Sequence, residues 1–215
     1  MRRLLAELPT DVRDFVLFAY LTGMRKGEIA SLVWTNVEGD TIRLPGKNSK
    51  NGEARLIPFE GELKALIERR RAARQIELNG TVQLAEHLFH RQGANIAYFQ
   101  RSWRTAAVKA GLGVWACETC ETQGTEKKCP ECEAGRTYRG PIFHDTRRSA
   151  VRNMVQAGVA PQVAMRISGH KTDSMFRRYS IIVEDDLRKA LVQTEKYRNA
   201  AGEKVVRMQG RKNEG

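Results

Sequence analysis

The 215-residue sequence lacks any hydrophobic run that approaches the roughly 20 apolar residues of a membrane span. Its first residues, Met1 to Glu7, also lack the long apolar segment of a secretory signal. We therefore expect a cytoplasmic protein with no membrane partner. Cysteine is scarce, and all four cysteines lie between Cys117 and Cys132. In a cytosolic chain this clustering favours a metal site over a disulfide framework.

Acidic residues are fewer than basic residues in the sequence. The chain has 25 Asp and Glu against 37 Lys and Arg, which gives a formal net charge of +12. Such an excess favours a polyanionic partner such as DNA or RNA, although many basic proteins bind no nucleic acid. The 41% of hydrophobic residues is enough for a substantial core.

Hydrophobic periodicity predicts a mainly α fold with a small antiparallel β-sheet. Apolar residues at helical spacing over 8–32 are interrupted at Thr22-Gly23, which predicts two helices with a tight corner. Two short strands, 41–44 and 55–58, are predicted to form a hairpin or part of a three-stranded sheet. Further helices are predicted over 62–78, 96–110, 149–157, 161–167, 174–182 and 185–199, followed by a polar, basic end that we expect to be disordered.

Residues 144–180 collect cationic and hydrogen-bonding side chains. His144 and Arg147 are three residues apart, so a helix that begins near Asp145 would place them on one face. An arginine binds a phosphate through two parallel hydrogen bonds, and Arg25 offers a second such group beside the Thr22-Gly23 corner. Taken singly, each residue has an ordinary reading: Arg25 as a surface arginine paired with Glu28, a histidine or tyrosine as a structural residue.

Taken together, five segments in order resemble the catalytic domain of the tyrosine recombinases, the phage-integrase family. The resemblance runs from about Leu8 to Asp186 and rests on Thr22–Glu28, Ser49–Gly52 with Arg55–Pro58, His144–Arg147, Gly169–Lys171 and Tyr179. It implies a site-specific DNA recombinase or integrase of a mobile genetic element, of bacterial or phage origin and associated with the nucleoid. The implied catalytic residues are Arg25, Lys50, His144, Arg147, His170 and Tyr179.

The resemblance also implies a role for each of these residues. Arg25 and Arg147 would clamp the phosphate, Lys50 would protonate the leaving 5′-hydroxyl, and Tyr179 would be the nucleophile. His144 is the favoured group for accepting the tyrosine proton, His170 occupies the second histidine position, and Glu28 would orient active-site groups. Lys47 is a rival for the lysine role. Fixed cations stabilise the developing charge of a phosphodiester transition state, and we expect no metal ion or ATP in the chemistry.

The resemblance divides the chain into parts. Residues 1–186 are predicted to be the catalytic domain, and 187–215 a C-terminal helix with a flexible basic tail. The N-terminal core-binding domain of full-length relatives is expected to be absent. The implied partners are double-stranded DNA and further copies of the chain, as a tetramer on DNA or a monomer without it. The alternatives are a type IB topoisomerase-like DNA-relaxing enzyme and a non-catalytic DNA-binding or regulatory protein on the same scaffold.

Residues 113–140 depart from the family pattern as an insertion within the catalytic domain. Two C-x-x-C motifs, separated by eight residues, can supply four thiolates to a tetrahedral Zn²⁺. The predicted ligands of this structural zinc are Cys117, Cys120, Cys129 and Cys132. Redox disulfides and an iron cluster are the competing readings, and contact with protein is favoured over contact with DNA. Trp115 and Tyr138 flank the motifs and are expected to pack the insertion onto the domain.

Overall fold

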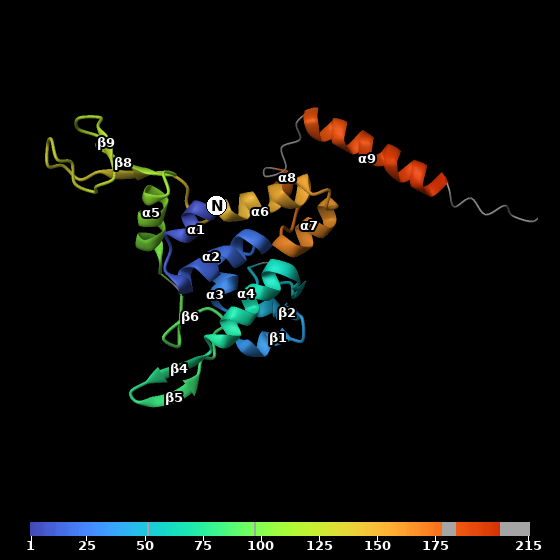
Figure 1. The fold of residues 1–215 in the computed structure, drawn as a ribbon, viewed down its shortest axis with the longest axis horizontal. Coiled ribbons are helices and arrows are strands. Elements are labelled where there is room, and N and C mark those ends of the chain that lie inside the picture. The colour runs from blue at the N-terminus through green and yellow to red at the C-terminus, as the bar shows by residue number, and fades with distance from the viewer. Residues whose placement is uncertain (51, 97, 178–183, 203–215) are drawn as a thin grey trace, which may run out of the picture. The chain divides into compact units, whose positions relative to one another are not determined.

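The computed structural model describes residues 1–50, 52–96, 98–177 and 184–202 (Figure 1). Two compact units are distinguished along the chain, Met1–Tyr179 and Ser180–Gly215. The helices described are α1 (Arg2–Ala6), α2 (Thr10–Thr22), α3 (Lys26–Ala30), α4 (Gly61–Ala72), α5 (Gln100–Lys109), α6 (Asp145–Gln156), α7 (Pro161–Ser168), α8 (Asp173–Arg177) and α9 (Glu184–Gly202), the last in the second unit. No helix among the described residues is both long and apolar enough to cross a membrane.

The strands form four small antiparallel sheets. The first has the order β1-β2-β3, so the hairpin predicted at 41–58 is part of a three-stranded sheet. The insertion holds a second three-stranded sheet of order β10-β8-β9, and two hairpins, β4-β5 and β6-β7, complete the set. The strands are β1 (Val37–Glu38), β2 (Thr41–Leu44), β3 (Arg55–Pro58), β4 (Gln75–Leu78), β5 (Thr81–Leu84), β6 (His90–Arg91), β7 (Ala94–Asn95), β8 (Val114–Ala116), β9 (Gln123–Gly124) and β10 (Thr137–Arg139).

The helix predicted over 62–78 is wrong in its last part. Helix α4 ends at Ala72, and Gln75–Leu78 is strand β4, which pairs with β5. Asn79 and Gly80 between the strands both have positive φ, of 52° and 74°. That combination is a two-residue hairpin turn, and Asn-Gly is its preferred sequence. The Asn-Gly pair therefore joins two strands, where we had expected the end of a helix.

Helix α2 forms the centre of the first unit. Its buried residues include Phe15 and Phe18, whose rings lie 5.5 and 5.1 Å from that of Phe89. Phe99 and Phe143 extend this aromatic cluster toward the start of α6. Helix α6 packs against both α2 and α7, and α7 also contacts strand β3. This arrangement brings the C-terminal ends of α2 and α7 to the first turn of α6, where the candidate site lies.

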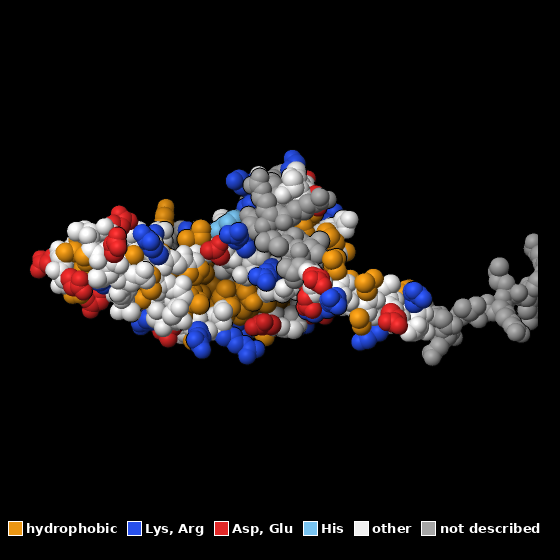
Figure 2. All heavy atoms as spheres, turned by 90° about the horizontal axis from the view of Figure 1, so that it is seen from above, with side chains coloured by type: hydrophobic (Ala, Val, Ile, Leu, Met, Phe, Trp, Pro, Cys, Tyr) orange, Lys and Arg blue, Asp and Glu red, His pale blue; other side chains and the backbone are white. Residues whose placement is uncertain are grey.

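Basic side chains are spread over the face drawn in Figure 2, interspersed with hydrophobic ones. The net charge therefore does not by itself indicate where a polyanion would bind. The arrangement of individual side chains is more informative.

Candidate active site

Two helix ends converge on the side chain of Arg147. Helices α2 and α7 both end at a glycine in the left-handed conformation, Gly23 with φ 69° and Gly169 with φ 72°. The first is the helix stop expected from the sequence, and both are typical glycine helix ends. Arg147, which is only 3% exposed, donates from Nη1 to the carbonyl oxygens of Gly23, at 2.5 Å, and Ser168. Helix C-terminal carbonyls lack partners within their own helix and carry a partial negative charge, so they favour a buried guanidinium at this place.

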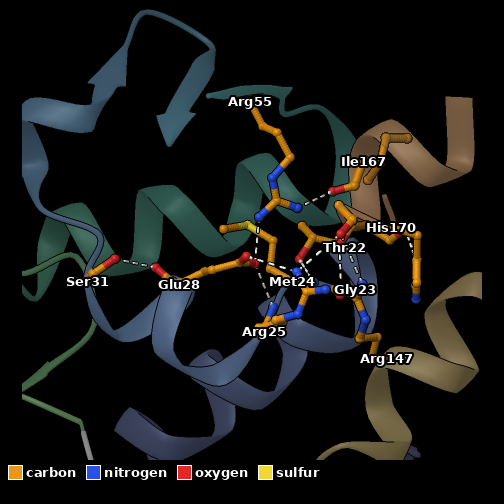
Figure 3. Close-up of polar contacts among 12 residues, drawn as sticks. Thr22, Gly23, Met24, Arg25, Glu28, Ser31, Arg55, Arg147, Ile167 and His170 are labelled. Carbon is orange, nitrogen blue, oxygen red and sulfur yellow. Dashed lines mark hydrogen bonds and ion pairs between the residues drawn. The ribbon is translucent and has the colours of Figure 1, made fainter. Parts of the chain in front are cut away.

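Arg25 reaches the same place from the other side of the α2–α3 corner. Its Nη1 donates to the carbonyl oxygen of Gly169 at 3.1 Å, and Nη2 of Arg147 donates to the same oxygen at 3.3 Å. Two guanidinium groups from residues 122 positions apart therefore meet at one oxygen atom (Figure 3). The side chain of Arg25 is 18% exposed, so this group borders solvent. Two guanidinium groups this close together could bind one small anion jointly.

Glu28 fixes both Arg25 and a third arginine. Its carboxylate accepts from the backbone N–H of Arg25 at 3.0 Å and from Nη1 of Arg25 at 3.2 Å. It also forms an ion pair of 2.5 Å with Nη2 of Arg55, and both side chains are almost fully buried. Burial alone would raise the pKa of Glu28, but the Arg25 N–H and the charge of Arg55 outweigh it and lower the pKa. Glu28 therefore stays ionised and holds the two guanidinium groups in place.

Arg55 was not singled out as a functional residue from the sequence, and the structure adds it to the site. It lies at the start of β3, opposite Leu44, and donates from Nη1 to the carbonyl oxygen of Ile167 at 3.3 Å. A signal was present in the sequence. In a strand whose alternate residue Ile57 faces the core, Arg55 occupies the other inward position, and a buried charge there requires a partner.

Gly169 lets the backbone approach Arg55 closely. A Cβ atom at this position would collide with the guanidinium of Arg55, and the φ of 72° is one that other residues rarely adopt. The glycine thus serves two purposes, ending α7 and leaving room for Arg55 beside a carbonyl that accepts from Arg25 and Arg147.

The two histidines differ in burial. His170 is 6% exposed, and its Nδ1 lies 2.8 Å from the Ser168 hydroxyl, which itself donates to the carbonyl of Ala164 at 2.7 Å. Burial, together with the charges of Arg147 and Arg25, lowers the pKa of His170 to about 3. His144 is the exposed N-cap of α6, and burial and Arg147 lower its pKa as well. Both imidazoles are therefore neutral at neutral pH, the form that accepts a proton.

The structure brings Arg25, Arg147 and His170 together, and His144 shares a pocket with both arginines. This pocket has a volume of about 470 Å³ and mostly aromatic and apolar walls that include Phe99, Trp103 and Phe143. Lys50 is exposed in the connection between β2 and β3 and makes no hydrogen bond or ion pair within the described part of the chain. Tyr179 lies outside the described residues. The catalytic roles of all six residues stay predictions.

The insertion places its four cysteine sulfurs in one cluster. All four Sγ atoms lie within 4.8 Å of one another, with separations of 3.5 Å for Cys117 to Cys132 and 3.4 Å for Cys120 to Cys129. Four thiolates at about 2.3 Å from a tetrahedral Zn²⁺ would be about 3.8 Å apart. The cluster therefore matches the size of a four-cysteine zinc site.

The two C-x-x-C motifs have the same backbone conformation. The N–H of each first cysteine donates at 2.8 Å to the carbonyl five residues later, from Cys117 to Thr122 and from Cys129 to Ala134. The residue after each second cysteine, Glu121 and Glu133, has φ 58°. In each motif, backbone N–H groups also lower the pKa of the first cysteine by bonding to its sulfur. Two matching loops that direct N–H groups at sulfur are suited to thiolate ligands.

Without a cation the four thiols cannot all ionise. A hydrogen bond from the Thr122 hydroxyl lowers the pKa of Cys129 to about 5. The backbone N–H of Ala134 favours the thiolate of Cys132, but hydrogen bonding with Cys117 and burial outweigh it and raise that pKa to about 12. A divalent cation at the centre would stabilise all four thiolates at once.

Comparison with known proteins agrees with this geometry. The sequence model of the phage integrase family matches residues 1–183. Similar solved structures include the Tn1549 transposon integrase in complex with a circular intermediate DNA, at 16% identity over 89% of this chain and 63% of that chain, with a TM-score of 0.61. XerA recombinase is 17% identical over 90% of this chain and 62% of that chain, with a TM-score of 0.59.

A lambda integrase dimer bound to a COC′ core site is 17% identical, with a TM-score of 0.59; the match covers 83% of this chain and 56% of that chain. At these identities the likeness shows the fold. No curated protein sequence was found to match. The helices and small antiparallel sheets form the expected tyrosine-recombinase catalytic-domain fold. Because the family model spans well over half of the sequence, the chain belongs to the phage integrase family.

Proposed function

We propose that this chain is the catalytic part of a site-specific DNA recombinase that cuts and rejoins DNA through a covalent 3′-phosphotyrosyl intermediate. The observation that carries the proposal is the meeting of Arg25 and Arg147 at a single carbonyl oxygen, beside His170. A scissile phosphate beside these guanidinium groups would find their donors already in place. Preorganised cations of this kind stabilise transition-state charge without a reorganisation cost.

The proposed reaction begins with attack of the Tyr179 phenol on phosphorus. The P–O5′ bond breaks, the phenol proton passes to the neutral imidazole of His144, and Lys50 donates a proton to the leaving 5′-oxygen, which becomes a 5′-hydroxyl. The neutral state of His144 supports its role as proton acceptor, because burial and Arg147 lower its pKa. The phosphodiester energy is kept in the tyrosyl link, so a 5′-hydroxyl from another strand can reverse the steps and rejoin the DNA.

Glu28 and Arg55 would act as positioning residues. Neither needs to touch the phosphate, because the buried pair holds Arg25 through the carboxylate and supports the end of α7 through Ile167. The proposed site is therefore built from α3, β3, α6 and α7 together.

The insertion is proposed to bind one structural Zn²⁺ through Cys117, Cys120, Cys129 and Cys132. The matching backbone loops and sulfur spacings support this assignment. When bound, the metal would hold the two loops together, since the only regular structure of the insertion among the described residues is a small three-stranded sheet. The side chain of Arg136 donates to Thr122 at 3.0 Å and approaches Cys129 Sγ at 3.7 Å, which would further favour the thiolate state.

The proposed partner is double-stranded DNA. The lambda integrase structures contain a dimer on a core site and a tetramer on a Holliday junction, and we extend to this chain the same kind of assembly on DNA. We propose that the protein works in the cytoplasm, on DNA of a mobile genetic element, and that 1–186 forms the catalytic domain.

The proposal is tested with a nicked suicide DNA substrate carrying the attachment site. We expect a covalent protein–DNA adduct that survives denaturation, is absent in Tyr179→Phe and falls strongly in Arg147→Ala. Parent protein that binds this DNA without forming an adduct would instead support a non-catalytic binding protein. Relaxation of a supercoiled plasmid without an attachment site would support the topoisomerase-like alternative.

A further inference from the structure

The insertion contacts the segment that precedes α6 through Tyr138. Its hydroxyl donates to the carbonyl oxygen of Pro141 at 2.9 Å, and Nε1 of Trp103 on α5 donates to the same oxygen at 2.7 Å. Pro141 is three residues before His144. The chain between them is held at one end by these two donors and in the middle by the ring of Phe143, which packs 5.1 Å from Phe99 and 5.8 Å from Trp103.

The ring of Tyr138 fits between the two ends of the insertion. A Cβ atom at Gly113 would lie 2.8 Å from Cε2 of Tyr138, and one at Gly140 would lie 2.7 Å from its hydroxyl oxygen. No other residue type leaves space for the ring at these positions. Burial also raises the pKa of Tyr138, which keeps its hydroxyl protonated and able to donate.

On its other side Tyr138 is tied to the cysteine cluster. Tyr138 on β10 is the cross-strand partner of Trp115 on β8, with ring centroids 5.5 Å apart. Trp115 is 7% exposed and stands two residues before Cys117. Two contacts, Trp115 with Tyr138 and Tyr138 with Pro141, thus connect a strand that ends one residue before Cys117 to the short segment that leads into His144. In Figure 1 the insertion extends beside α5 and away from α7.

From these contacts we propose that Tyr138 is a positioning residue through which the four-cysteine insertion sets the place of His144. The inference rests on the proposed function for the role of His144 and on the proposed zinc. When the cluster is loaded, β8 and β10 are held in register and the Tyr138 hydroxyl fixes Pro141. When the cluster loses its metal, this anchor loosens and DNA cleavage slows. The insertion is then a metal-sensitive control on the recombinase.

The first test is Tyr138→Phe, which removes one oxygen and keeps the ring between the two glycines. In the zinc-loaded protein without DNA, we expect the NMR signal of the His144 ring, assigned by loss in His144→Asn, to shift and its pKa to change. Cleavage of the suicide substrate at saturating DNA should slow by roughly five- to tenfold, the effect of one hydrogen bond, with DNA affinity unchanged. Tyr20→Phe is the matched control, because the described residues show no hydrogen bond to that hydroxyl.

The second test removes the metal with a chelator. In the parent protein the His144 signal should move in the same direction as in Tyr138→Phe, and in Tyr138→Phe the chelator should add little. The inference would be overturned if the chelator had equal effects in both proteins. It would also be overturned if zinc-loaded Tyr138→Phe kept the parental His144 signal and the parental cleavage rate. The NMR measurement needs no DNA cleavage, so it decides this inference even when the parent forms no adduct. A missing adduct would count against the proposed function alone.

Discussion

Replacing His170 by asparagine should change how the stability of the protein depends on pH. Asparagine is neutral at every pH, and its amide can keep the hydrogen bond that Nδ1 of His170 makes with Ser168. In the folded protein the pKa of His170 is lowered from 6.5 to about 3, by burial and then by Arg147 and Arg25. The unfolded chain therefore binds a proton at this residue in a pH range where the folded chain does not.

The sign and size follow from proton linkage. Stability rises with pH wherever the unfolded state binds more protons, so the His170 contribution is fully favourable above pH 6.5 and is lost as pH falls toward 3. At about pH 5, which is about 1.5 units below the unfolded pKa, the loss is about 2 kcal/mol. Glu28 adds little to this change, because the stabilisation from its lowered pKa is fully present above its unfolded value of 4.5 and is lost only as pH falls below that value.

The assay is urea unfolding at about pH 7.5 and about pH 5. The free energy of unfolding of the parent should fall between the two by about 2 kcal/mol more than that of His170→Asn. His144→Asn is the matched control, because that exposed side chain should contribute a smaller, solvent-screened difference. The same pH dependence in the parent and in His170→Asn would refute the reasoning, since it would mean that the arginines do not keep His170 neutral.

Three further predictions concern the supports of the site. Gly169→Ala should lower the free energy of unfolding by at least about 1 kcal/mol in urea unfolding, through the positive φ and the collision with Arg55, whereas Gly27→Ala, where no atom lies within 4 Å, should not. Glu28→Gln should cost about 3–5 kcal/mol in the same assay, because the buried guanidinium of Arg55 loses its partner; a loss below about 1 kcal/mol would argue against the buried pair. The protein should bind one zinc per chain by native mass spectrometry, and its removal should increase hydrogen exchange in 113–140 more than in α2; no bound metal would contradict the zinc assignment.

The parts of the fold that local chemistry decides could be predicted from the sequence. Glycines after Thr22 and Ser168 ended helices because only they adopt positive φ without strain, and the alternation at 41–44 and 55–58 produced paired strands. At 75–78 the alternating side chains were compatible with either element. Residues 75–78 form a strand because the Asn-Gly turn lets them pair with the strand at 81–84.

Within the site, residue types and order predicted that Arg25, Arg147 and His170 lie together, but not that Arg55 joins them or how these side chains are held. That Arg147 is bound by helix-end carbonyls depends on how α2, α6 and α7 pack, which no local pattern specifies. The Glu28–Arg55 pair joins residues 27 positions apart on different elements. Cysteine spacing predicted the metal-site candidates, whereas the contact from Tyr138 to Pro141 emerged only with the coordinates.

The most direct measurement of the central claim is mass spectrometry of the peptide that carries the nucleotide after suicide-substrate cleavage and nuclease trimming. The account predicts a single modified peptide, with a 3′-linked nucleotide on the oxygen of Tyr179. A nucleotide on another residue, or cleaved DNA with no protein-linked nucleotide, would contradict it.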